Sequence, residues 1–122
     1  MSNQQIAEQI ADNYLSRLSE GDLDGVASLY AEDATLEDPV GSEPIVGRAA
    51  IAEFYKFAIS MNVKLQRTGP VRCAANEMVF PFICHSYPEG AQMKIEIIDH
   101  FTLDDNNLIT KMRAFWSEAN IS

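Results

Sequence analysis

Residues 94–103 read KIEIIDHFTL, and polar and apolar side chains alternate through most of this stretch. Successive side chains of a β-strand point to opposite faces of a sheet, so a period of two indicates a strand with one buried face. The same alternation precedes it around residues 79–84 and follows it from about residue 108 to 117, which predicts an antiparallel sheet for the second half of the chain. The predicted inward residues are Phe80, Phe82, Cys84, Ile95, Ile97, Phe101, Leu103, Met112, Ala114 and Trp116.

The first half of the chain has helical periods instead. Ser2 and Gln5 match a capping box, and the helix that follows should end near Gly21. Asp22 predicts the start of a second helix that includes Tyr30, and a third begins after Gly47. The three apolar stripes are Ile6, Ile10, Tyr14 and Leu18; Val26, Leu29 and Tyr30; and Ile51, Phe54, Tyr55 and Ala58. This order predicts an α+β fold, with three N-terminal helices packed on one face of a curved, mainly antiparallel sheet.

Length and charge restrict the class of protein. The 122 residues predict a single domain, 1–122, and 18 acidic residues against 9 basic ones give a formal charge of −9. This charge disfavours nucleic acid and anionic membranes as partners. No signal peptide or long apolar run is evident, so we expect a cytoplasmic protein without membrane insertion. Two cysteines, Cys73 and Cys84, lack the spacing of a zinc site, and we expect reduced thiols and no metal.

Asp99 is a carboxyl in an apolar position. It lies between Ile97 and Phe101 on the predicted inward face, while His100 points outward. Burial disfavours the charged form, so the pKa of Asp99 should be raised and the group should be a hydrogen-bond donor near neutral pH. The competing interpretation is an aspartate at a bulge or sheet rim that reaches water or a backbone amide.

Asp38 ends a short extended run in which Ala34, Leu36 and Asp38 share one face. Pro39 then opens a loop, so the carboxylate should lie at the rim of a pocket, where a general base would be placed. A turn-initiating aspartate that bonds its own backbone explains the same spacing equally well.

Three tyrosines converge on the predicted core, namely Tyr14, Tyr30 and Tyr55, one from each helical stripe. A buried phenol requires a hydrogen-bond partner, although most such tyrosines simply place the hydroxyl at the edge of a core.

Several segments together resemble the bacterial ketosteroid isomerases. They are EDPVGSEP at residues 37–44, Tyr14 ahead of it, IDHF at 98–101 and FWSEANI at 115–121. The resemblance covers nearly the whole chain and includes residues 21–25 and 47–55, whereas residues 61–67 and 89–94 differ. It implies a conical fold of the nuclear transport factor type around a pocket, a homodimer and no cofactor.

The resemblance also implies an activity, the conversion of 3-oxo-delta-5 steroids to their conjugated isomers. Asp38 is similar to the base that moves the proton, and Tyr14 and Asp99 to the two donors that bind the enolate oxygen. A neutral carboxylic acid in an oxyanion hole is known from ketosteroid isomerase itself, so this role is taken from the family. By the same resemblance Tyr30 and Tyr55 support Tyr14, and the pocket walls are Phe54, Phe82, Met112 and Trp116.

Two other functional classes are consistent with an apolar pocket that contains a few polar groups. One is a polyketide cyclase, dehydratase or epoxide hydrolase on the same fold, and the other is a non-catalytic carrier of apolar ligands. Outward-facing His85 and His100 argue against a dehydratase, and the inward faces offer no arginine between two acids for epoxide opening.

The outward faces of the strands carry apolar residues too. A surface of this kind favours a homodimer through the outer sheet faces. The residues are Val79, Ile83, Ile98, Ile109 and Phe115.

Overall fold

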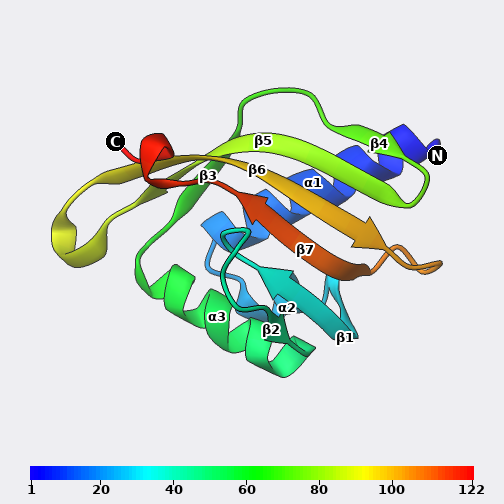
Figure 1. The fold of residues 1–122 in the computed structure, drawn as a ribbon, viewed down its shortest axis with the longest axis horizontal. Coiled ribbons are helices and arrows are strands. Elements are labelled where there is room, and N and C mark those ends of the chain that lie inside the picture. The colour runs from blue at the N-terminus through cyan, green and yellow to red at the C-terminus, as the bar shows by residue number, and fades with distance from the viewer.

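The computed structural model describes residues 1–122, and three helices lie against one curved sheet (Figure 1). The predicted α+β class is confirmed. The helices are α1 (Asn3–Ser19), α2 (Leu23–Ala27) and α3 (Arg48–Ser60), with short 3₁₀ turns at Pro88–Gly90 and Glu118–Asn120. The strands are β1 (Tyr30–Glu37), β2 (Ile45–Val46), β3 (Lys64–Arg67), β4 (Arg72–Ala74), β5 (Glu77–Ser86), β6 (Met93–Leu103) and β7 (Ile109–Phe115). None of the helices combines the length and the hydropathy that a membrane crossing requires.

The sheet has the order β2-β1-β7-β6-β5-β3, and β4 pairs with β5 beside β3. Every pairing is antiparallel except that of β1 with β7, which is parallel. β5 and β6 are the longest strands, and they carry Phe80 opposite Asp99 and Phe82 opposite Ile97 on the inner face. They therefore form the floor on which the helices pack.

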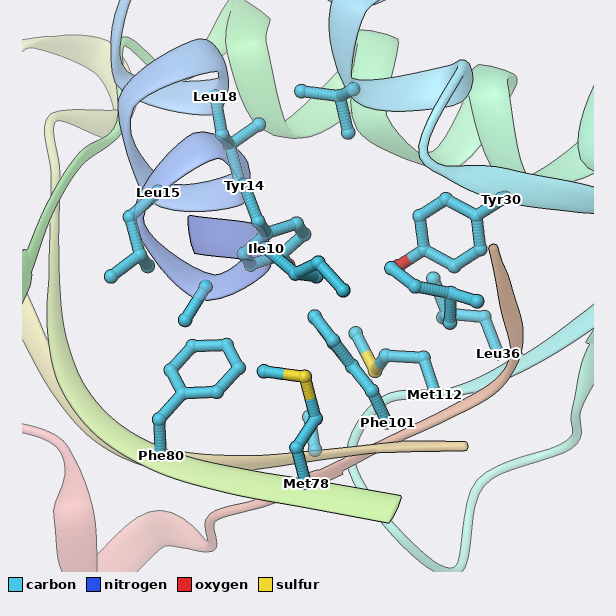
Figure 2. Close-up of a cluster of buried hydrophobic side chains, with 14 of the residues drawn as sticks. Ile10, Tyr14, Leu15, Leu18, Tyr30, Leu36, Met78, Phe80, Phe101 and Met112 are labelled. Atoms are coloured by element: carbon cyan, nitrogen blue, oxygen red, sulfur yellow. The ribbon is translucent and has the colours of Figure 1, made fainter. Parts of the chain in front are cut away.

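The core lies between α1 and the inner face of the sheet. The helix begins with the predicted capping box between Ser2 and Gln5. Its buried stripe faces aromatic and sulfur-containing side chains of the strands, as Figure 2 shows for Tyr14, Leu15, Met78 and Phe80. By contrast, only Ile51 and Tyr55 of α3 are buried, so this helix covers one end of the sheet less completely.

The prediction that Tyr30 belongs to the second helix is wrong. The α2 helix ends at Ala27, and Tyr30 is the first residue of β1, where it pairs with Ile109. The carbonyl of Tyr30 accepts two hydrogen bonds from the Arg48 guanidinium, at 2.9 and 2.8 Å. Pairing with β7 and this contact override a helical pattern that is only a few residues long.

The prediction that Ile109 faces outward is also wrong, since its side chain is fully buried. Leu103 pairs with Ile109 but Thr102 pairs with Lys111, so Thr110 is an extra residue in β7. Such a bulge shifts the alternation by one position, and Ile109 turns into the core while Met112 and Ala114 keep their predicted orientation. The strand β3 was not anticipated either, because four residues are too few for a clear period.

Candidate active site

A small cavity lies between α1, α3 and the inner face of the sheet, with a volume of about 80 Å³. Larger hollows of up to about 370 Å³ lie elsewhere on the molecule, but none of them contains a buried carboxyl group. The small cavity joins two aspartates to an otherwise apolar lining. Its residues are Tyr14, Leu18, Asp38, Phe54, Tyr55, Ala58, Val63, Leu65, Phe82, Cys84, Ile97 and Asp99.

The Asp99 carboxyl is the only buried acid of the chain, with 1% of the residue exposed. Neither of its oxygens has a hydrogen-bond partner in the protein. Burial raises the pKa of Asp99 well above its usual value, the negative charge of Asp38 raises it further, and the nearby Tyr14 hydroxyl offsets part of this. The raised pKa favours the protonated form of Asp99, which can donate a hydrogen bond into the cavity.

Three buried phenols form one hydrogen-bonded chain. The hydroxyl of Tyr55 lies 3.0 Å from that of Tyr14 and 2.5 Å from that of Tyr30. Burial raises the pKa of all three, so they stay protonated. When Tyr30 donates to Tyr55 and Tyr55 to Tyr14, the Tyr14 hydroxyl hydrogen is free for a ligand in the cavity, and the bond from Tyr55 lowers the pKa of Tyr14.

The Tyr14 ring is held by other aromatic rings. It packs edge-to-face on Phe80 and Phe101, with ring centroids 6.2 and 5.2 Å away (Figure 2). These contacts hold the hydroxyl oxygen in place, because a displacement of the ring would break both of them. The position of the phenol is thus set before a ligand binds.

Asp38 lies at the rim of the cavity, directly after β1, and is joined to Pro39 by a cis peptide bond. The loop is attached to the sheet where Val40 N–H donates to the Ala114 carbonyl at 2.8 Å. The indole N–H of Trp116 donates to Asp38 Oδ1 at 2.7 Å. Burial raises the pKa of Asp38, and the bond from Trp116 lowers it.

The two acids differ in how well their charge is stabilised. Asp99 is fully buried without a donor, whereas Asp38 is partly exposed and receives the Trp116 hydrogen bond. Like charges in one cavity disfavour double ionisation, and of the two carboxylates the one at Asp38 is the better stabilised. The arrangement can accept a proton at Asp38 while Tyr14 and Asp99 donate to an oxygen.

The predicted wall residues do not all lie at this cavity. Phe54 and Phe82 line it, and so does Tyr55. Met112 lies in the core beside Leu36, its partner in the β1–β7 pairing. Trp116 is not part of the lining, but it donates a hydrogen bond to Asp38, which is. Sequence reasoning missed the lining from Val63 and Leu65, whose spacing of two was the available signal for an inward face.

The cavity contains no imidazole or arginine, and no group of three or more His, Cys, Asp or Glu side chains in the chain could hold a metal ion. Cys84 is the lone thiol of the lining, and burial raises its pKa to about 11. It is therefore a neutral wall group at physiological pH. Both cysteines are free.

Comparison with known proteins points to one family. A family model described as SnoaL-like domain matches residues 11–112. A steroid Delta-isomerase from Nocardioides simplex is 40% identical over 108 residues, covering 88% of this chain and 87% of that protein. The epoxide hydrolase LasB from Streptomyces lasalocidi is 29% identical over 127 residues, covering all of this chain and 45% of LasB.

A solved structure has nearly the same fold. The structure of SalBIII, described as an epoxide hydrolase/cyclase-like enzyme in pyran ring formation of the polyether salinomycin, has a TM-score of 0.92. Its sequence is 28% identical, and the match covers 100% of this chain and 98% of that one.

The protonated state of Asp99 has a measurable consequence for stability. From the ordinary pKa of 3.8 upwards, the unfolded chain loses the Asp99 proton while the folded protein keeps it. The free energy of unfolding should therefore fall with rising pH, relative to an Asp99→Asn variant, by at most about 1.4 kcal/mol per pH unit. Urea titrations of both proteins between acid and neutral pH measure the difference. A pH-independent difference would mean that Asp99 is ionised in the folded state.

Proposed function

Because this chain belongs to the SnoaL-like domain family, we propose that it is a steroid delta-isomerase, which converts 3-oxo-delta-5 steroids to their conjugated delta-4 isomers without a cofactor. One observation carries the proposal: a buried carboxyl without a partner, Asp99, lies with the Tyr14 phenol in the same cavity as the Asp38 carboxylate. The isomerase from Nocardioides simplex, the most similar of the relatives above by identity, supports an isomerase.

The reaction moves one proton within the substrate. Asp38 takes a proton from the carbon between the ketone and the double bond, and the ketone oxygen gains the negative charge of a dienolate. Tyr14 and Asp99 each donate a hydrogen bond to that oxygen. Asp38, now protonated, returns the proton to the far end of the dienolate, so the double bond is conjugated and the enzyme regains its starting state.

The donors accelerate the reaction because they favour the dienolate over the neutral ketone. They are held in place before the substrate arrives, and the apolar lining keeps water from competing with them. Tyr55 and Tyr30 act through Tyr14, since their bonds orient its hydroxyl and lower its pKa relative to an isolated buried phenol. They are positioning residues and do not touch the reacting atoms.

Epoxide opening is the main alternative within the family, and it is the activity in the names of LasB and SalBIII. An epoxide oxygen also gains negative charge as its ring opens, so the same donors would serve it. The absence of arginine and histidine from the lining leaves only Asp38 to activate a nucleophile. A carrier role would not require any of these groups to lose or gain a proton.

Turnover of an unconjugated 3-oxo-delta-5 steroid separates these functions. We expect wild-type protein to raise the ultraviolet absorbance of the conjugated enone. Asp38→Asn should lower kcat by about two to four decades, since the base is lost. Asp99→Leu should lower it by about two to three decades while a steroid phenol still binds.

The control for these variants is Cys84→Ala, which trims the same cavity but removes neither the proposed base nor a proposed donor to the enolate oxygen. Steroid binding without conversion by the wild type would favour a carrier. Conversion that persists undiminished in Asp38→Asn would exclude Asp38 as the base.

Trp116 is a positioning residue for the base, because its indole N–H stabilises the ionised form of Asp38. Trp116→Phe keeps an aromatic ring but removes the donor, so the pKa of Asp38 should rise. The base must be ionised, and the acid limb of the kcat/KM profile should therefore move to higher pH, with kcat/KM about tenfold lower on the acid side of the limb. Phe54→Leu, which alters the same cavity but removes no hydrogen bond to Asp38, should reduce kcat/KM without moving that limb. An unshifted limb in Trp116→Phe would refute this role.

The outer face of the sheet supports a homodimer. Ile98 and Phe115 are cross-strand partners, 49% and 43% exposed, and Val79 on β5 adds a further exposed apolar side chain. We expect wild-type protein to sediment as a dimer at micromolar concentration and Ile98→Glu to sediment as a monomer, because a buried charge would be left unpaired. Val46→Glu, at an exposed position on β2, should remain dimeric. A monomeric wild type would overturn the dimer.

A further inference from the structure

Only two residues of this chain have buried side-chain oxygens without a hydrogen-bond partner in the protein, Asp99 and Ser86. Asp99 belongs to the candidate active site, whereas the proposed mechanism assigns no role to Ser86. Ser86 is the last residue of β5 and is 1% exposed. A buried hydroxyl without a partner has lost its contact with water and gained nothing in exchange. Such a group points to a partner that the protein itself does not supply.

The position of Ser86 connects it with the active-site cavity. Phe82, Cys84 and Ser86 follow one another at intervals of two along β5, so their side chains share the inner face. Phe82 and Cys84 line the cavity. On the neighbouring strand Lys64 pairs with His85, and Val63, another lining residue, precedes Lys64. Ser86 is thus flanked by lining residues on its own strand and beside it.

Packed aromatic rings close the cavity at one end along the sheet. Beyond Asp99 the inner face is filled by Tyr14, Phe80 and Phe101, which pack edge-to-face on one another (Figure 2). The present volume of about 80 Å³ is smaller than a four-ring molecule. A ligand with one end at Asp99 must therefore extend along β5 past Phe82 and Cys84.

The distance along this path suits a long ligand. Phe80, which is the partner of Asp99, and Ser86 are six residues apart on β5. At a rise of about 3.3 Å per residue this is about 20 Å along the strand, and less in a straight line because the sheet curves. A four-ring skeleton with an oxygen at each end, together with a hydrogen bond at each end, spans a distance of this order.

We propose that the Ser86 hydroxyl is a second polar anchor of the substrate site, which binds an oxygen on the ring farthest from the reacting ketone. A serine hydroxyl can donate to a ketone or accept from a hydroxyl, so the substrates it selects are 3-oxo steroids with either group at the far end. The inference rests on the proposed function. Ser86 does not touch the reacting atoms, and it determines specificity without taking part in the chemistry.

The test compares two phenols that bind without reacting. Equilenin carries a phenol at one end and a ketone at the other, and 17-deoxyequilenin lacks the ketone. Their affinities for the wild-type protein are measured by the change in naphthol fluorescence. We expect the wild type to prefer equilenin and Ser86→Ala to lower the ratio of the two affinities about fivefold, the contribution of one net hydrogen bond. Cys84→Ala, the matched control on the same strand, should weaken both phenols by similar factors.

Two further measurements separate an anchor from a structural role. A hydroxyl without a partner contributes no hydrogen bond to the free protein, so Ser86→Ala should not lower the melting temperature in the absence of ligand. Ser86→Cys keeps the size of the side chain with a weaker donor, and its affinity ratio should fall between those of wild type and Ser86→Ala.

The outcomes distinguish this inference from the proposed function. If both phenols bind with the same ratio in the wild type and in Ser86→Ala, the anchor is overturned and the isomerase proposal is unaffected. If Ser86→Ala loses thermal stability and the ratio is unchanged, Ser86 is a structural residue. If the wild type binds neither phenol and converts no steroid, both the proposed function and the role of Ser86 as an anchor are refuted.

Discussion

The carboxyl of Asp99 in a hydrocarbon environment is the constraint on which the rest of the site depends. Because a charge there would be neither solvated nor paired, the group keeps its proton and becomes a donor. That neutrality in turn allows Asp38 to be ionised, since a second charge in the same small cavity would oppose the first. The two acids are chemically identical side chains, and burial together with the Trp116 hydrogen bond gives them opposite roles.

In the proposed mechanism, rigid elements carry the donors and a loop junction carries the base. Asp99 lies in the middle of the longest strand, and Tyr14 is held by two aromatic rings and a chain of phenols. An oxygen that gains charge stays in one place, so donors at fixed positions suit it. A group that collects a proton at one carbon and delivers it at another must reach both, and Asp38 lies at the partly exposed end of β1 rather than within a strand.

The sequence predicted the parts of this structure that depend on a long period. The alternation within residues 94–103 was enough to orient Asp99 in β6, and the four-residue stripe of α1 was enough to orient Tyr14. Short or interrupted patterns failed. The extra residue Thr110 in β7 turned Ile109 inward. The α2 helix has only five residues, which is too short a pattern to show that Tyr30 lies outside it. The hydrogen bond between Trp116 and Asp38 joins residues 78 positions apart, and no local pattern encodes such a contact. The roles of Asp38 and Asp99 were predicted from the family resemblance. The alternation alone was also consistent with an aspartate at a turn for Asp38 and an aspartate at a sheet rim for Asp99.

The fold and the donor pair do not by themselves decide the reaction. Two hydrogen-bond donors stabilise any oxygen that becomes negative, whether it belongs to a dienolate or to an opening epoxide. Chemistry is decided by which atom lies within reach of Asp38 when the oxygen is bound. In an apolar cavity that atom is set by where the rest of the ligand is held, which in the proposed binding mode is the inner face of β5 from Phe82 to Ser86. Relatives with the same fold and different activities are expected on this basis, because a change in the residues that line the cavity moves the substrate and leaves the donors in place.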